Sequence, residues 1–350
     1  HRCQRKTNMI PEPINRLGAE IILWLQAHLS ILYGPMKPFT LMGEELFYMI
    51  LIPLIYWCVH RGTGLRLLAL ITTSSFVNSI LKWSLYSPRP YWWDANIEGL
   101  RAEGDFGPPS GHSQNAVTFW GYLTATLHRF RPRRWLWPAF LVLAFLISFS
   151  RMLLGVHFPN DLILGWTAGA VFLFAFWKLE PRFEGWFRSL RLGPQIGVSL
   201  TISLAMLAFA IVYSKFMASV VAIDPAFFEN AAADQPAKVV DPFNPKAPVS
   251  YAAVVAGLGI GSALMLRTAN FSAGGSGLKR AARYLIGLIG IFAIYASGYF
   301  APETLPEWEY LGLRYLRYFA MMLWAIWLAP MLFIRTGLAD PATPAKKEKA

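Results

Sequence analysis

The chain has 350 residues, of which 55% are hydrophobic and 15% are charged, and its mean hydropathy is +0.39. A soluble domain carries about a quarter charged residues, so this composition excludes an ordinary soluble protein and predicts an all-α, polytopic membrane helical bundle. The net charge of +12 is spread over short loops without a long basic face, which argues against a nucleic-acid partner. Cys3 and Cys58 form no disulfide or metal-binding pattern, and the sequence shows no zinc-ligand spacing.

Residues 1–8, HRCQRKTN, precede Met9 and are left out of the fold prediction because they need not be native. The next apolar stretch, residues 19–34, is interrupted by Gln26, His28 and Ser30. We therefore predict that residues 1–40 comprise an N-terminal extension and an amphipathic helix that lies at the membrane surface. A tenth membrane span is the less favoured alternative.

Nine further apolar runs approach the roughly 20 residues that a helix needs to cross a bilayer. They occupy residues 41–59, 65–85, 113–130, 135–150, 161–178, 196–215, 250–267, 282–299 and 312–335. Every second connection is rich in Lys and Arg, namely residues 60–66, 128–134, 178–191 and 279–283 and the basic tail 336–350. Because positive loops mark the cytoplasmic side, the pattern predicts about nine transmembrane helices with the N-terminus outside and the C-terminus in the cytoplasm.

Three polar clusters fall at the outer ends of these spans. KWSLYSPRP ends the second span, GPPSGHS opens the third, and SRMLLGVHFPND joins the fourth to the fifth. Charged groups near hydrocarbon are costly and mark functional sites. Since all three clusters lie at one membrane face, we expect them to form one site. The long segment 216–249 is expected to be an outer loop or lid.

The residue types in these clusters suit a phosphate group. Lys82, Arg89 and Arg151 supply positive charge, and arginine adds a fork of donors that matches phosphate oxygens. Ser110 and Gly111 lie just before an apolar helix, where backbone N–H groups are available to an anion. Each residue alone has an ordinary structural explanation, such as a lysine that snorkels to the interface. Their coincidence at one face favours a phosphate-binding site.

Two histidines and an aspartate add reactive groups. A neutral imidazole can attack phosphorus while a second histidine protonates the departing oxygen, so His112 and His157 are a candidate pair. Asp161 follows His157 by four residues and could hold its other ring N–H, although a salt bridge from Asp161 to Arg151 is the structural alternative. Glu44 is ambiguous, because it and its neighbour Glu45 could shape the pocket or tether the N-terminal helix.

Together, the three clusters resemble the signature of the type 2 phosphatidic acid phosphatase superfamily. The matching segments are K-x6-R-P (Lys82, Arg89, Pro90), P-S-G-H (Pro109 to His112) and S-R-x5-H-x3-D (Ser150, Arg151, His157, Asp161). No motif position departs from the family pattern. The motifs cover residues 82–161, and residues 65–178 fit the family's core bundle.

The resemblance implies that His157 is the nucleophile that becomes phosphohistidine, that Asp161 orients it and that His112 protonates the leaving group. The residues implied to bind the phosphoryl group are Lys82, Arg89, Ser110, Gly111 and Arg151. No metal and no cofactor takes part. A six-helix-like phosphatase core is expected within residues 41–195, followed by additional transmembrane helices in residues 196–335.

The chain is similar to bacterial membrane phosphatases of lipid phosphates and, in RPYWW and the layout of its spans, to glucose-6-phosphatase. Asp161 differs from the glutamine of glucose-6-phosphatase at this position, and the aromatic residues from Trp83 to Trp93 suit a membrane interface. We therefore expect a hydrolase of a lipid phosphate or diphosphate, such as a prenyl diphosphate or phosphatidic acid, among membrane lipids. Its place would be a bacterial inner membrane, with the site on the periplasmic or outer face.

Three alternatives remain open at this point. One is a phosphatase of a soluble sugar phosphate, and another is a lipid phosphotransferase that passes the phosphoryl group to a second acceptor. The third is a channel, transporter or structural subunit that keeps the motifs without turnover. Trapping of a phosphohistidine would separate an enzyme from this third alternative.

Overall fold

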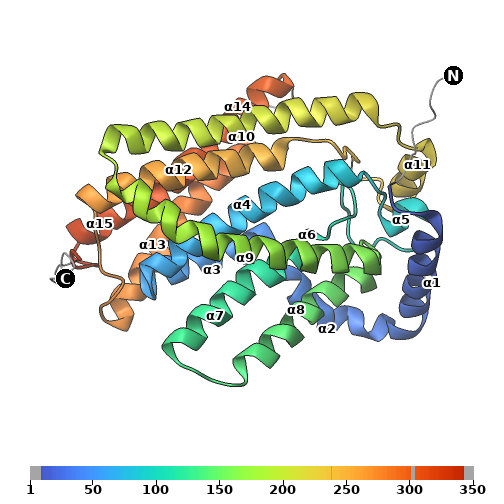
Figure 1. Ribbon diagram of the computed structural model, residues 1–350, viewed down its shortest axis with the longest axis horizontal. Helices are drawn as coiled ribbons and strands as arrows, with labels where there is room; N and C mark the ends of the chain where they lie inside the picture. The colour runs from blue at the N-terminus through green and yellow to red at the C-terminus, as the bar shows by residue number, and fades with distance from the viewer. Residues whose placement is uncertain (1–8, 238, 301–303, 343–350) are drawn as a thin grey trace. The chain divides into compact units, whose positions relative to one another are not determined.

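The computed structural model describes residues 9–237, 239–300 and 304–342, so residues 1–8 and the basic stretch 346–349 of the expected tail lie outside the described residues. The described part is helical and contains no strand apart from an isolated bridge between Phe271 and Pro341 (Figure 1). The helices are α1 (Glu12–Leu29), η1 (Ser30–Leu32), α2 (Tyr33–Leu41), α3 (Glu45–Cys58), α4 (Arg61–Leu85), α5 (Pro90–Trp93), α6 (Gly111–Asn115), η2 (Ala116–Trp120), α7 (Gly121–Phe130), α8 (Leu136–Leu153), α9 (Pro159–Ser189), α10 (Leu192–Val220), α11 (Pro225–Asp234), α12 (Lys246–Thr268), α13 (Gly277–Ala296), η3 (Ser297–Phe300), α14 (Glu307–Leu323), η4 (Trp324–Leu328) and α15 (Ala329–Arg335).

The helices form two compact units. The first comprises His1–Tyr48, Leu70–Glu180 and Leu207–Pro248. The second comprises Met49–Ala69, Pro181–Met206 and Val249–Ala350. All three polar clusters predicted from the sequence belong to the first unit. The domain boundaries expected from the sequence stay a prediction.

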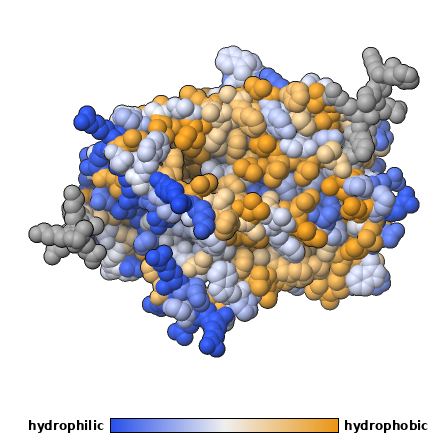
Figure 2. Space-filling model, in the orientation of Figure 1, coloured by the Kyte–Doolittle hydropathy of each residue, from blue (hydrophilic) through white to orange (hydrophobic). Residues whose placement is uncertain are grey.

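All nine predicted apolar runs coincide with helical segments. Eight helices of the described chain are long and apolar enough to cross a membrane, and α3 is a shorter apolar helix. Figure 2 shows apolar residues over much of the visible surface, with hydrophilic residues gathered at the α7–α8 connection. The protein is therefore an integral membrane protein, as its composition predicts.

The N-terminal helical segment differs in length from the predicted surface helix. Glu12–Leu41 is long and apolar enough by itself to count among the eight candidate spans. It is not one straight rod, because the 3-10 turn η1 separates α1 from α2 and the two helices bend at this turn (Figure 1). The sequence between Gly111 and Phe130 is likewise divided by the π-helical turn η2, and this segment is not among the eight.

Close packing of α9 against α6 organises the first unit. Gly165 and Gly169 lie one turn apart on α9, and each faces backbone of the α6 region. A Cβ at position 165 would come within 2.6 Å of the Ser110 carbonyl oxygen, and one at position 169 within 2.7 Å of the Gln114 carbonyl oxygen. Small residues let helix backbones approach each other closely in membranes. The two glycines thereby bring the start of α9 next to the PSGH segment.

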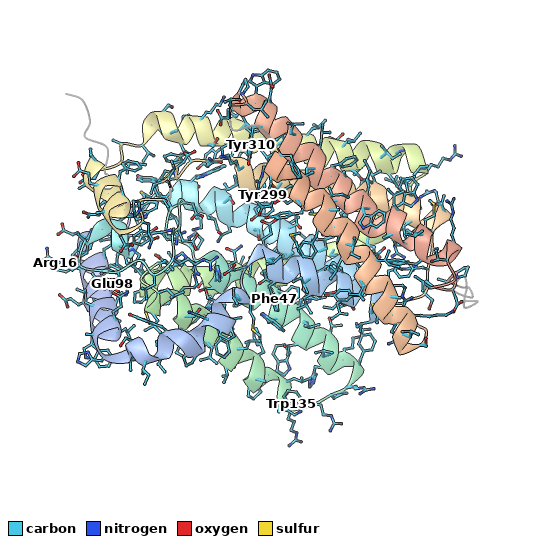
Figure 3. All side chains as sticks on the ribbon, turned by 180° about the vertical axis from the view of Figure 1, so that it is seen from behind. Arg16, Phe47, Glu98, Trp135, Tyr299 and Tyr310 are labelled. Atoms are coloured by element: carbon cyan, nitrogen blue, oxygen red, sulfur yellow. The ribbon has the colours of Figure 1, made fainter. Side chains whose placement is uncertain are left out.

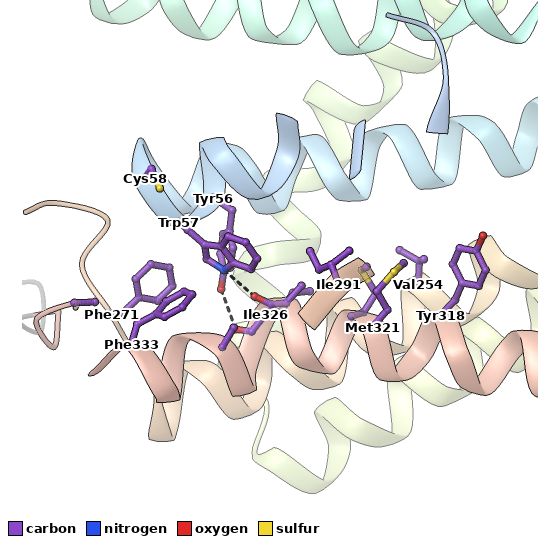
Figure 4. Close-up of a cluster of buried hydrophobic side chains, with 14 of the residues drawn as sticks. Tyr56, Trp57, Cys58, Val254, Phe271, Ile291, Tyr318, Met321, Ile326 and Phe333 are labelled. Atoms are coloured by element: carbon purple, nitrogen blue, oxygen red, sulfur yellow. Dashed lines mark hydrogen bonds between the residues drawn. The ribbon is translucent and has the colours of Figure 1, made fainter. Parts of the chain in front are cut away.

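The second unit is held together around Tyr56 and Trp57 of α3 (Figure 4). The Tyr56 hydroxyl donates to the Ile326 carbonyl at 3.0 Å, and the Trp57 indole donates to the Ala325 carbonyl at 2.9 Å. Pro330 lies four residues after Ile326 and has no N–H group to donate to that carbonyl. The two aromatic side chains therefore supply donors where the proline and the π-helical turn η4 interrupt the helix.

The packing of α9 gives a test on a single helix. Gly165→Ala should lower the melting temperature, because overpacking a filled position costs about 1–3 kcal/mol. Gly185→Ala is the matched control, since nothing lies within 4 Å of a Cβ there and alanine is favoured over glycine in a helix by about 1 kcal/mol. Thermal denaturation of both variants in detergent measures the difference. An unchanged melting temperature for Gly165→Ala would contradict the close approach of α9 to α6.

Candidate active site

The connection between α8 and α9 places His157 outside both helices. Helix α8 ends at Leu153, and Gly155 follows with φ of 70°, in the left-handed region that glycine adopts without strain. The residue at this position must also be small, because a Cβ would lie 2.2 Å from the Glu98 carbonyl oxygen. Helix α9 then begins at Pro159, a residue that suits the first turn. The side chain of His157 is buried.

Asp161, in the first turn of α9, orients His157. The His157 Nδ1 lies 3.2 Å from Asp161 Oδ2, and the Phe158 backbone N–H donates to the same oxygen at 3.0 Å. The Asn160 amide donates to Asp161 Oδ1 at 3.1 Å. Because a carboxylate only accepts, the proton of a neutral His157 ring belongs on Nδ1, which leaves Nε2 with a free electron pair to accept or to attack.

The same aspartate connects the second and third motifs. Its backbone carbonyl accepts a hydrogen bond of 3.0 Å from the Ser110 N–H. Ser110 caps α6, and its hydroxyl accepts from the Ser113 N–H. Behind this segment, the amide of Asn78 on α4 donates to the Pro109 carbonyl at 3.2 Å and to the Gln114 side chain at 2.9 Å. The backbone from Pro109 to Gly111 is therefore held from both sides.

Arg89 lies at the start of α5 and is buried. Its Nη1 donates to the Val156 carbonyl at 2.9 Å and lies 3.3 Å from His157 Nε2. Its Nε donates to the Asp105 backbone carbonyl at 2.7 Å, and its Nη2 forms an ion pair with the Asp105 carboxylate. The guanidinium thus joins the first motif to the third and lies beside Nε2 of His157, the nitrogen of the predicted nucleophile.

The other two predicted cations lie in the same buried cluster. Lys82 Nζ is 3.2 Å from Asp105 Oδ2 and donates to the carbonyls of Phe106 and Gly107. Arg151 donates to the Thr40 hydroxyl at 2.7 Å and forms an ion pair with Glu103. The alternative pairing of Arg151 with Asp161 does not occur, because Arg151 turns toward α2 and Glu103 instead.

His112 is in α6, and its ring packs against the short connection between α2 and α3. A Cβ at Gly43 would be 2.1 Å from the His112 ring, so glycine is required for the ring to fit. The backbone of Thr40 forms a hydrogen bond with His112, whereas the buried His112 Nε2 has no hydrogen-bond partner in the described structure. This unsatisfied nitrogen is available to a substrate atom. Glu44, from the same connection, pairs with Arg101 at 2.5 Å.

Electrostatics of the connecting loops fixes three charge states. Burial lowers the pKa of His157 well below its usual value, and the positive charges of Arg89 and Lys82 lower it further, so the imidazole is neutral. Burial by itself would raise the pKa of Glu103 and of Asp105, but the cations around them outweigh it and hold both pKa values below the usual range. Both carboxylates are therefore ionised at neutral pH.

Four residues that contribute to this cluster were not predicted from the sequence. Glu103 and Asp105 stand in the connection between the first two motifs, and two acidic residues between cationic motifs were the available signal. Asn78 precedes Lys82 by one helical turn and so shares its face of α4. Thr40 carried no signal, because its role depends on the bend between α1 and α2. Among the described residues, no group of three His, Cys, Asp or Glu side chains could hold a metal ion.

Residues 221–237 and 239–248 cover the aromatic part of the first motif. The Asn230 amide on α11 donates to the Trp92 carbonyl at 2.9 Å, and the Trp83 indole donates to the Pro242 carbonyl at 3.1 Å. Trp83, Tyr91 and Trp92 are buried, so the expectation that these residues lie at the lipid interface is wrong for all three. They pack beneath α11 and the non-helical segment that follows it.

Comparison with known proteins identifies two parts of the chain. Residues 63–184 match the PAP2 superfamily model, and residues 249–341 match the model described as PAP2 superfamily phosphatase, transmembrane extension. The first match contains all three motifs. The second corresponds to the additional helices that the sequence predicts after the core.

Curated relatives include glucose-6-phosphatases. The chain is 26% identical over 192 residues to glucose-6-phosphatase 2 of Mus musculus and 28% identical over 189 residues to glucose-6-phosphatase 3 of Homo sapiens. Each match covers 47% of this chain and 54% of the relative, so the chain spans about half the length of these relatives.

One solved structure also matches part of the chain. It is the crystal structure of a transmembrane PAP2-type phosphatidylglycerolphosphate phosphatase from Bacillus subtilis, with 22% identity and a TM-score of 0.42. The match covers 49% of this chain and 86% of that chain. The two family matches together cover more than half of the chain, and the first contains all three motifs. The chain therefore belongs to the PAP2 superfamily and carries both its core domain and its transmembrane extension.

Proposed function

We propose that the protein is a membrane phosphatase that hydrolyses a lipid phosphate or diphosphate through a phosphohistidine on His157. The observation that supports this most directly is the buried His157–Asp161 pair, whose reactive nitrogen faces Arg89 within a cluster of three cations. A neutral imidazole held by a carboxylate is a nucleophile, and fixed cations stabilise the charge of a transferring phosphoryl group.

In the first step of the proposed reaction, His157 Nε2 attacks phosphorus and the bond from phosphorus to the leaving oxygen breaks. Lys82, Arg89 and Arg151 balance the charge on the phosphoryl oxygens. Asp161 stabilises the positive charge that develops on the ring, since it lies at Nδ1. These cations give the site positive charge of its own, and the proposed steps use no metal.

In this proposal His112 enters the step protonated, and its Nε2, which has no partner in the described structure, donates its proton to the leaving oxygen. Water then attacks the phosphohistidine, the phosphorus–nitrogen bond breaks, and His112 accepts the proton of that water. The products are the alcohol or monophosphate, inorganic phosphate and the regenerated enzyme. An acceptor alcohol in place of water would give the phosphotransferase variant of the same chemistry.

A sugar phosphate is the second candidate substrate, because the curated relatives are glucose-6-phosphatases. The buried position of Trp83, Tyr91 and Trp92 also removes one argument for a lipid at this site. A panel of a prenyl diphosphate, phosphatidic acid and glucose 6-phosphate, assayed for phosphate release in detergent with EDTA, separates the candidates. Preference for glucose 6-phosphate would establish the sugar phosphate as the substrate class. A folded protein without turnover of any of these substrates would favour a non-catalytic role.

We also propose that the protein resides in a bacterial inner membrane, with its site on the periplasmic or outer face.

His157→Ala should reduce kcat by at least about 10³-fold, because the variant lacks the attacking nitrogen. Incubation with a ³²P-labelled substrate and denaturation in alkali should trap a phosphorylated wild-type chain and an unlabelled variant. His28→Ala is the control, since His28 stacks on Trp24 at an exposed position of α1. Phosphorylation of a folded His157→Ala protein would rule out His157 as the nucleophile.

Arg89→Lys should reduce kcat/KM about 10- to 100-fold although the charge is kept. Lysine cannot reach the Val156 carbonyl, the Asp105 backbone and His157 Nε2 together, and each hydrogen bond to a charged group contributes roughly 1.5–3 kcal/mol. Steady-state kinetics on the best substrate measures the loss. Near-normal kinetics would show that positive charge alone suffices at this position.

A further inference from the structure

The three cations of the site already hold an anionic partner. Asp105 contacts both Lys82 and Arg89, and Glu103 contacts Arg151 and lies 4.0 Å from Arg89. These are the cations that would bind the phosphoryl group. Two carboxylates of the same chain therefore occupy the cations that a phosphate would need, and we expect them to compete with it.

The carboxylates lie on the solvent side of the cations. The side chains of Lys82, Arg89 and Arg151 are 7%, 2% and 1% exposed, whereas those of Glu103 and Asp105 are 24% and 47% exposed. The cations form the floor of the cluster and the acids form its outer layer. An anion that arrives from solvent therefore meets these carboxylates, with Arg101 beside Glu103, before it reaches the three buried cations.

The two carboxylates match a phosphate group in charge. Both are ionised, so together they carry a charge of −2 opposite three positive side chains. A phosphomonoester carries a charge of about −1.5 to −2 near pH 7. A phosphodiester carries a single negative charge. Exchange of the carboxylates for a monoester therefore leaves the net charge of the cluster nearly unchanged, whereas exchange for a diester makes it more positive.

Rotation of the two side chains is enough for this exchange. The Tyr91 hydroxyl donates to the Glu103 carbonyl at 2.8 Å and accepts from the Glu103 N–H at 3.0 Å, which fixes the backbone there. The Gly104 carbonyl accepts from the Asp241 N–H at 3.1 Å. Lys82 and Arg89 also keep backbone carbonyl partners when the carboxylates leave.

We propose that Glu103 and Asp105 act as an internal competitor for the phosphoryl-binding cations and so set the affinity that an anion needs to occupy the site. The competitor lowers the apparent affinity for every anion by the same factor, because each must displace it. Phosphomonoesters and diphosphates still bind, whereas phosphodiesters, which bind more weakly, no longer occupy the site. Since ordinary membrane phospholipids are phosphodiesters, the two carboxylates keep the surrounding lipids out of the site. This inference rests on the proposed function for its substrate class.

The test compares Asp105→Asn, the double variant Glu103→Gln/Asp105→Asn and the control Glu98→Gln. Glu98 lies in the same connection but is exposed beside α1, where its backbone pairs with Gln26 (Figure 3). The probes are inorganic phosphate and diethyl phosphate. Their inhibition constants and the rise in melting temperature that each produces are measured in detergent at one ionic strength, since bound ligand stabilises the folded state.

In the double variant both inhibition constants should fall about 10-fold or more, and by similar factors, as expected when a competitor that fills about nine sites in ten is removed. Asp105→Asn should account for most of the fall because Asp105 contacts two of the cations. Glu98→Gln should leave both constants unchanged. An equal fall in Glu98→Gln would indicate a general charge effect and would overturn the proposal.

Unchanged or weaker binding in folded Asp105→Asn would also overturn the proposal and would show that the acids only hold the cations in place. If the double variant fails to fold, Asp105→Asn alone decides. The melting-temperature readout needs no turnover. Tighter phosphate binding without turnover in any variant would therefore refute the proposed function while supporting the competitor, and turnover with unchanged binding would do the reverse.

Discussion

The buried carboxylate of Asp161 is the contact on which the rest of the site depends. It accepts from the His157 ring, from the Phe158 backbone and from the Asn160 amide, while the backbone carbonyl of the same residue accepts from Ser110. One residue thereby sets the tautomer of the candidate nucleophile and the distance between the second and third motifs. A buried carboxylate without such partners is strongly destabilising, so this network must form together with the packing of α9 on α6.

The remaining charges of the site obey the same constraint. A cluster of three buried cations is costly in a membrane protein unless anions lie close by. Glu103 and Asp105 meet that need, since between them they pair with all three cations. In the proposed function, an anionic substrate would gain affinity only to the extent that it replaces these contacts with better ones. The stability of the cluster and the proposed competition with anions would then depend on the same two side chains.

Helices and motif residues could be predicted from the sequence because both leave local signals. Apolar runs of sufficient length gave all nine helical segments, and motif spacing gave His157, Asp161 and the cations around Arg89, which the structure brings together. Contacts made across long stretches of chain left no such signal. Thr40 reaches Arg151 only because α1 and α2 bend, and Trp83 is buried only because the chain after α11 folds back over it. Exposure of an aromatic residue depends on what covers it, and periodicity does not report that.

The missing N–H of Pro330 has a consequence for how the second unit assembles. Hydrocarbon offers no water to a carbonyl, so the Ile326 and Ala325 carbonyls have protein donors only once α3 is beside them. The donors Tyr56 and Trp57 leave the ribosome about 270 residues before their acceptors do. Neither contact can therefore form until the helical segment that carries Ala325 and Ile326 has been inserted. The second unit completes its packing only when η4 has joined α3.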